Sequence, residues 1–144
     1  MARYLADTTI WAWAAKQDRL DIRKKLSERF AQDQIVTCSP VVLEALHRPD
    51  SRARYEAAYL DYFDPLDWLP LDAVASERAV EVQREMARAS AGNHRRGAVD
   101  FLIAAVAEAA GDGYVLWHFD KDLRLICKHT GQPQEAEGST GPGR

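Results

Sequence analysis

The chain has 144 residues, of which 47% are hydrophobic and 28% charged, and its formal net charge is −3. This length suits one domain, and the composition is too apolar for a disordered chain. The negative balance argues against a protein that coats nucleic acid nonspecifically, because such a protein would be strongly basic.

Short apolar runs alternate with helical patterns along the chain. In chain order, the predicted elements are a strand at residues 3–6, a helical region at 10–30 with a break near Asp18, a strand at 34–39, helices at 41–47 and 51–63, a weak strand at 67–71, helices at 73–89 and 99–110, a strand at 114–119 and a helix at 123–129. Alternation of this kind predicts an α/β fold in which helices cover both faces of a parallel sheet.

The composition changes once, at Gly131, after which large apolar residues are absent. We therefore expect one domain over residues 1–130 and a flexible tail over residues 131–144. The two cysteines form no CxxC pair, which argues against a disulfide scaffold. The longest uncharged apolar run, residues 101–107, is far shorter than the ~20 residues that span a bilayer. A cytoplasmic protein without a membrane segment is expected.

Four acidic residues lie within or beside apolar sequence. Asp7 and Asp120 each follow an apolar strand, and Glu44 and Asp100 are expected near the starts of helices that leave the same sheet edge. Each acid alone has an ordinary explanation as a turn, cap or solvent-facing residue. Together, without matching basic residues close in sequence, they predict an all-oxygen site for Mg²⁺ or Mn²⁺ rather than for zinc.

Four segments, YLADTTIW, SPVVLEAL, VDFLIAAVAEAAG and VLWHFDKDLRLICKHTGQP, occur in an order that resembles the PIN-domain ribonucleases, and more narrowly the VapC-type toxins. The resemblance implies a three-layer α/β/α fold with a central parallel sheet. It also implies these roles: catalysis for Asp7, Glu44, Asp100 and Asp120, metal binding for Asp7, Asp100, Asp120 and Asp122, and support of the first acid for Thr9. Phe119 and Leu123 depart from the usual pattern without removing a carboxylate.

The activity implied by the resemblance is Mg²⁺-dependent cleavage of tRNA or rRNA, which inhibits translation. The general base is left open, with Glu44 as a candidate to orient the attacking water. Arg95 and Arg96 lie in the predicted loop just before Asp100 and are expected to bind RNA phosphates. His118, inside an apolar strand, is interpreted as a packed core residue.

A VapC-type toxin is silenced by a VapB-type antitoxin, so the resemblance implies such a partner and a homodimer. The aromatic residues expected to receive the antitoxin are Trp11, Trp13, Tyr55, Tyr59 and Tyr62. Two alternatives stay open: a catalytically inactive PIN-like binding module and a Rossmann-like metal-dependent phosphohydrolase. An inactive module would have lost acids that this chain keeps. A haloacid-dehalogenase-like enzyme would need an aspartate where Thr9 stands.

Overall fold

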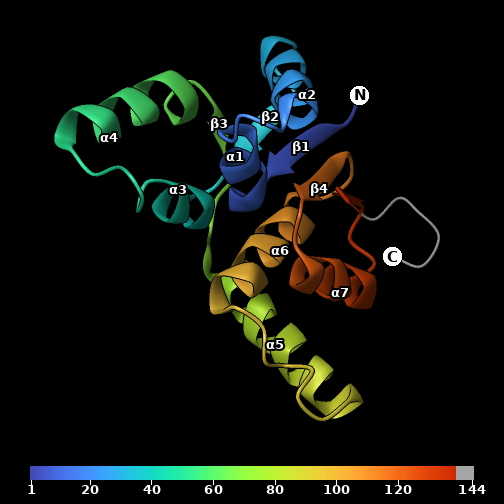
Figure 1. Ribbon diagram of the computed structural model, residues 1–144. Coiled ribbons are helices and arrows are strands. Elements are labelled where there is room, and N and C mark those ends of the chain that lie inside the picture. Colours follow the sequence, from blue (N-terminus) through green and yellow to red (C-terminus); the bar gives the residue numbers. More distant parts are fainter. Residues whose placement is uncertain (139–144) are drawn as a thin grey trace.

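The computed structural model describes residues 1–138 and has a five-stranded sheet at its centre (Figure 1). The strands are β1 (Arg3–Ala6), β2 (Ile35–Thr37), β3 (Asp67–Trp68), β4 (Tyr114–His118) and β5 (Gln134–Ala136). They lie in the order β3-β2-β1-β4-β5, and every pairing is parallel. The expected parallel sheet is therefore confirmed.

Helices cover both faces of this sheet because successive strand residues point to opposite sides. Leu5 and Leu116 enter a core shared with α5 (Ala73–Ala89), α6 (Ala98–Ala110) and α7 (Lys121–Thr130). Ala6 and Trp117 enter a second core shared with α1 (Thr8–Ala14) and α2 (Leu20–Ala31). The three-layer architecture follows from this division.

A third group of helices extends from the sheet (Figure 1). It consists of α3 (Ser39–Ala45), α4 (Arg52–Ala58) and the π-helical turn η1 (Tyr59–Phe63). Val42, Leu46 and Phe63 form a small core of their own, against which Trp11 of α1 packs. Within residues 1–138, no helix combines the length and apolar character needed to cross a membrane.

Several predicted elements differ from the observed ones in their bounds, and the weak strand expected at 67–71 is reduced to Asp67–Trp68. The strand expected at residues 34–39 is shorter, because Ser39 already begins α3 and Pro40 occupies its first turn. The single helix expected at 51–63 changes to a π-helical turn at Tyr59. The expected end of the long apolar helix at Gly111 is confirmed, and this glycine has φ of 90°.

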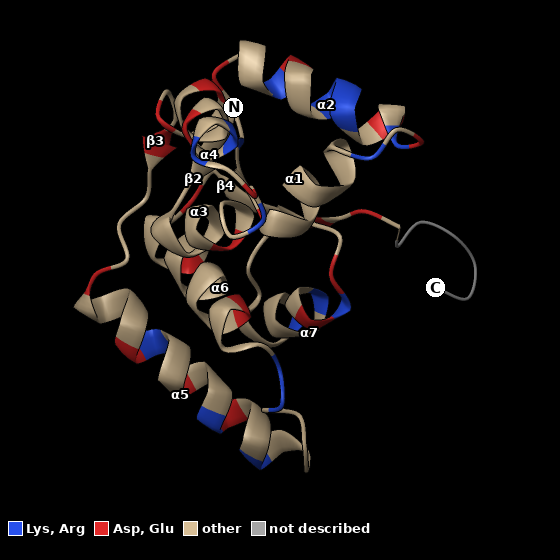
Figure 2. Cartoon of the chain, turned by 60° about the vertical axis from the view of Figure 1, so that its left-hand side comes forward, with Lys and Arg blue, Asp and Glu red and all other residues tan. Residues whose placement is uncertain are grey.

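The expectation of a flexible tail from residue 131 does not hold for residues 131–138, which join the sheet through β5. Glu135 and Glu137 form ion pairs with Arg29 and Lys25 of α2, respectively. Figure 2 shows Lys and Arg positions in blue along α2. The indole of Trp117 also donates a hydrogen bond to Glu137. These partners lie far away in sequence, so local composition could not reveal them. The remainder of the expected tail, residues 139–144, lies outside the described residues.

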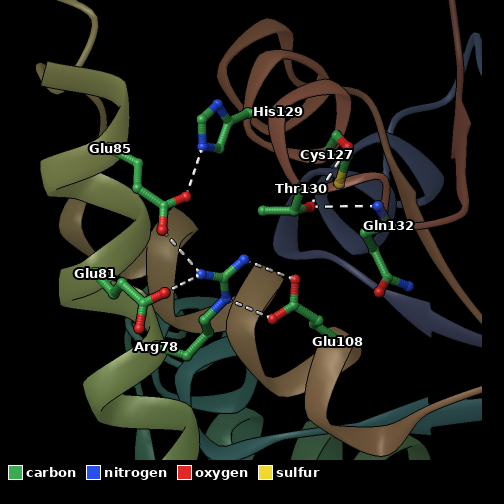
Figure 3. A network of polar contacts seen from close by, with 8 residues as sticks. All are labelled: Arg78, Glu81, Glu85, Glu108, Cys127, His129, Thr130 and Gln132. Atoms are coloured by element: carbon green, nitrogen blue, oxygen red, sulfur yellow. Dashed lines mark hydrogen bonds and ion pairs between the residues drawn. The ribbon is translucent and has the colours of Figure 1, made fainter. Parts of the chain in front are cut away.

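A charged cluster joins α5 to α6 and α7 (Figure 3). Arg78 of α5 donates to Glu108 of α6 over 2.7 Å, and also to Glu81 and Glu85 on its own helix. The bond to Glu108 is the main reason that the pKa of Arg78 lies above its ordinary value. Glu85 also contacts His129 of α7 at 2.9 Å. The cluster thereby fixes the two helices that carry Asp100 and Asp122.

Candidate functional site

The carboxyl ends of the two central strands define the site. Asp7 follows β1 directly and caps α1, while Asp120 lies just beyond β4 and caps α7. Since β1 and β4 pair in parallel, with Ala6 opposite Trp117, both acids emerge at the same edge of the sheet. Open parallel sheets place their functional sites at this edge.

Asp7 is almost fully buried, with 2% of its surface exposed. Its Oδ2 accepts hydrogen bonds from the backbone N–H of Thr9 at 3.1 Å and from the Thr9 hydroxyl at 2.7 Å. Its Oδ1 is buried and has no hydrogen-bond partner among the described residues. Burial, with a contribution from the charge of Asp120, raises the pKa of Asp7 to about 6. An unpartnered buried carboxylate oxygen is costly unless it meets a cation or a proton.

Asp100 lies in the first turn of α6 and faces the other acids. Oxygens of Asp100, Asp120 and Asp122 lie within 4.8 Å of one another, as expected for ligands of one ion. Burial raises the pKa of Asp100 to about 7, and the charges of Asp120, Asp7, Glu44 and Asp122 raise it further in that order. Carboxylates that repel one another in this way favour capture of a divalent cation.

The position of Glu44 in its helix and its exposure differ from what the sequence predicted. It is the penultimate residue of α3, not near its start, and its side chain is exposed although its neighbours are apolar. Its Oε1 accepts a hydrogen bond from the Thr8 hydroxyl at 2.9 Å, which connects it to the start of α1. Its charge contributes to the raised pKa of Asp100, but Glu44 does not belong to the group of oxygens that lie within 4.8 Å of one another. The sequence suggested Thr8 only as a possible cap of the first helix, a position that Asp7 occupies, and did not predict its bond to Glu44.

Thr9 joins the two central strand ends. Its hydroxyl donates to Asp7 and accepts a hydrogen bond of 2.9 Å from the backbone N–H of Phe119. The residue after Phe119, Asp120, uses its Oδ1 to cap the N–H groups of Asp122 and Leu123 at the start of α7. One threonine therefore fixes the first acid and the turn that presents another.

The two arginines of the loop before α6 have different surroundings. Arg95 is exposed, whereas Arg96 donates to Asp122 over 2.7 Å and also to the backbone and side-chain oxygens of Asn93. The guanidinium of Arg96 thus neutralises one acid of the cluster. Gly97 lets the loop come close, because a Cβ there would lie 3.0 Å from Oδ2 of Asp100. Sequence analysis missed this glycine, since only the tertiary contact gives it a role.

The residues present fit a magnesium-type ion. The cluster offers only carboxylate oxygens, which Mg²⁺ and Mn²⁺ prefer, and Asp7 Oδ1 is an acceptor without a donor among the described residues. Asp100, Asp120 and Asp122 form the group of carboxylates close enough to share such an ion, and Asp7 is not part of that group. Glu44, exposed and fixed by Thr8, lies at the outer side of the cluster.

A groove of about 870 Å³ lies between α1, α2 and the arm formed by α3, α4 and η1. Trp11 and Tyr62 line it, as does Thr8, which donates to Glu44. The other three aromatic residues expected on such a surface are not among its lining residues. Trp13 stacks on Phe119 at 4.8 Å, Tyr59 packs against Trp68 at 6.4 Å, and Tyr55 is exposed on α4.

Comparisons with known proteins agree with this geometry. The model of the PIN domain family matches residues 4–129. Ribonuclease VapC18 of Mycobacterium tuberculosis is 35% identical over 133 residues, which cover 92% of this chain and 93% of that protein.

Solved structures give the same fold. DNA-bound VapBC from Salmonella typhimurium matches with a TM-score of 0.72 at 20% identity, over 94% of this chain and 98% of that one. VapBC2 from Rickettsia felis, bound to a promoter DNA fragment, matches with a TM-score of 0.71 at 18% identity, over 92% of this chain and 97% of that one. FitAcB from Neisseria gonorrhoeae matches with a TM-score of 0.67 at 15% identity, over 91% of this chain and 95% of that one.

Proposed function

Because the chain belongs to the PIN domain family, and within it to the VapC-type ribonucleases, we propose that it is the toxin of a type II toxin–antitoxin pair and acts as a metal-dependent endoribonuclease. One observation carries this proposal. Oxygens of Asp100, Asp120 and Asp122 lie within 4.8 Å of one another, beside the strand end from which Asp7 emerges with an unpartnered buried oxygen, and this arrangement supports a cation site.

We assign the metal to Asp7, Asp100, Asp120 and Asp122, with Mg²⁺ as the ion and Mn²⁺ as a substitute. A bound ion would activate a water molecule and neutralise charge on the phosphoryl group. Thr9 keeps Asp7 and the turn before Asp120 in fixed relation. Glu44, held by Thr8, is assigned to orient the attacking water or to accept its proton.

Removal of divalent metal is expected to reduce cleavage at least about 100-fold. The measurement incubates the purified chain with total RNA in Mg²⁺, in Mn²⁺ and in EDTA, and sequences the new RNA ends. Cleavage is expected with either metal, absent in EDTA and restored when Mg²⁺ is returned in excess. The mapped ends also tell whether tRNA or rRNA is cut. Equal cleavage in EDTA would contradict the proposal.

Arg95 and Arg96 are proposed to contact phosphates of the RNA. Arg95 is exposed and precedes Arg96 in the loop, and Arg96 reaches a phosphate only when it leaves Asp122. A net charge of −3 makes such local cations important, because the molecule as a whole repels RNA.

Arg95→Ala is expected to lower the slope of log affinity against log salt by about 1, because one phosphate contact is lost. The affinity for RNA is measured at several salt concentrations, with Arg95→Ala introduced into a variant that no longer cleaves RNA. Arg52→Ala, which removes an exposed arginine on α4, is the matched control and should keep the slope. An unchanged slope for Arg95→Ala would place the phosphate contacts elsewhere.

A VapB-type antitoxin is the proposed protein partner, and the groove between α1, α2 and the α3–η1 arm is its proposed seat. VapBC complexes are among the structural neighbours. The groove has an apolar wall that includes Trp11, Leu26 and Phe63, which suits the apolar face of a bound segment. Because Thr8 both lines the groove and bonds to Glu44, a segment lying there ends beside the acids.

A homodimer is proposed as well. The exposed apolar side chains Leu43 on α3 and Val74 and Val80 on α5 are candidates for such an interface, since large apolar side chains gain free energy when they leave water.

A further inference from the structure

His118 is the last residue of β4 and is completely buried. Both nitrogens of its ring have partners. Nδ1 lies 3.1 Å from the backbone N–H of Asp120, and Nε2 lies 2.8 Å from Oε1 of Gln134 in β5. A backbone N–H can only donate, so Nδ1 accepts and carries no proton. The ring is therefore neutral, with its hydrogen on Nε2, which donates to Gln134.

The Nδ1 bond acts where the chain leaves the sheet. Beyond β4, side chains accept from two successive backbone N–H groups: the Thr9 hydroxyl from Phe119, and His118 from Asp120. These two bonds determine how the chain turns toward α7. The turn in turn directs the Asp120 carboxylate, whose Oδ1 caps α7. Neither cap bond uses the other oxygen of Asp120, Oδ2.

The Nε2 bond has a different consequence. Gln134 accepts from His118 and donates through Nε2 to the backbone oxygen of Arg124 in α7 at 3.3 Å. This side of the ring joins β5 and α7 to β4, but it does not touch the backbone of Asp120. The two nitrogens of one ring therefore perform separable tasks, one at the acid and one in the packing of the edge strand.

We propose that His118 is a positioning residue for the metal site, and that its Nδ1, by accepting from the N–H of Asp120, sets the direction of the Asp120 carboxylate. The proposal rests on the proposed function only in taking Asp120 as a metal ligand. Removing the partner that orients a ligand typically lowers metal affinity by about 10–100-fold.

Two amide substitutions separate the tasks. In His118→Asn, the amide oxygen stands on Cγ, where Nδ1 stands in histidine, so the acceptor for Asp120 is kept and the Nε2 donor is lost. In His118→Gln, the amide reaches the Nε2 position and the Nδ1 acceptor is lost. Both variants place a neutral amide in the same buried space, so circular dichroism and thermal unfolding establish that both are folded before they are compared.

The probe is Mn²⁺ binding by calorimetry, together with hydrogen exchange of the Asp120 amide followed by NMR. His118→Asn is expected to bind Mn²⁺ within about 3-fold of the unmodified chain and to keep the Asp120 amide protected. His118→Gln is expected to bind at least about 10-fold more weakly and to exchange this amide faster. Gln134→Ala removes the partner of Nε2 and the bond to Arg124 but leaves the Nδ1 bond intact, so it is the control and should resemble the unmodified chain in both measurements.

Equal exchange of the Asp120 amide in His118→Asn and His118→Gln would overturn the proposal. Weakening by Gln134→Ala as strong as that by His118→Gln would also overturn it, because the ring would then act only by packing β5. A chain that binds no Mn²⁺ and cuts no RNA would contradict the proposed function. The amide exchange would still test His118, since it needs neither metal nor substrate.

Discussion

Asp100→Asn is expected to reduce RNA cleavage at least about 100-fold while the chain stays folded. Asp100 is the acid on which the charges of the other four converge, and its oxygen belongs to the group that lies within 4.8 Å. An amide is nearly the same size as a carboxylate but carries no charge, so it cannot compensate a divalent ion. Asp7→Asn should also reduce cleavage. The NH₂ group of the amide replaces one of the two carboxylate oxygens, either the unpartnered Oδ1 or the Oδ2 that accepts from Thr9.

The measurement is cleavage of total RNA in Mg²⁺ at equal protein concentration, with Mn²⁺ affinity from calorimetry as the second readout. The matched control is Asp112→Asn, an exposed aspartate between α6 and β4, which should cut RNA like the unmodified chain. In cells, induced expression of the unmodified chain and of Asp112→Asn should arrest growth, whereas Asp100→Asn should not. Growth arrest by Asp100→Asn would show that the assigned acids do not carry the reaction.

Without metal, the protein is expected to lose stability as the pH rises from about 4 to about 7. The pKa of Asp100 is about 7 and that of Asp7 about 6, both above the ordinary value of 3.8. Between the ordinary and the raised pKa, the folded state binds more protons than the unfolded state. Each raised pKa therefore makes a contribution that is present at low pH and is lost as the pH passes the folded value. Asp100 alone contributes on the order of 2 kcal/mol over this range, because its partial exposure to solvent reduces the effect of the full pKa shift.

The test is the free energy of unfolding in EDTA at several pH values for the unmodified chain and for Asp100→Asn. Because other groups also titrate, the quantity compared is the difference between the two proteins. Asp100→Asn should become the more stable of the two as the pH rises. Saturating Mg²⁺ should raise the free energy of unfolding of the unmodified chain at the upper end of the pH range, since an ion that binds only the folded state stabilises it. Parallel curves for the two proteins in EDTA would contradict the raised pKa of Asp100.

Local patterns in the sequence determine most of the secondary structure. The helix at residues 73–89 has Ala75, Ala79, Val82 and Met86 along one face, and all four are buried. The run at β4 is apolar without alternation, as a strand covered on both faces requires, and it lies in the interior of the sheet. Strand–helix alternation then suffices to predict parallel pairing and to send Asp7 and Asp120 to one edge.

Long-range contacts determine the rest. The charges of Glu135 and Glu137 look like a solvated tail until Arg29 and Lys25 of α2 are placed beside them. Arg96 looks free to bind phosphate until Asp122, 26 residues further along the chain, accepts its hydrogen bond.

The elements, the parallel sheet and the two acids at its carboxyl edge, Asp7 and Asp120, can be read from the chain alone, because hydrophobic periodicity and strand ends are local properties. Three further features depend on the folded molecule: the unpartnered oxygen of Asp7, the exposure of Glu44 and its hydrogen bond with Thr8, and the hydrogen bond from the backbone of Asp120 to His118. Burial and hydrogen bonding depend on atoms that distant segments bring together, and no local pattern encodes which atoms those are.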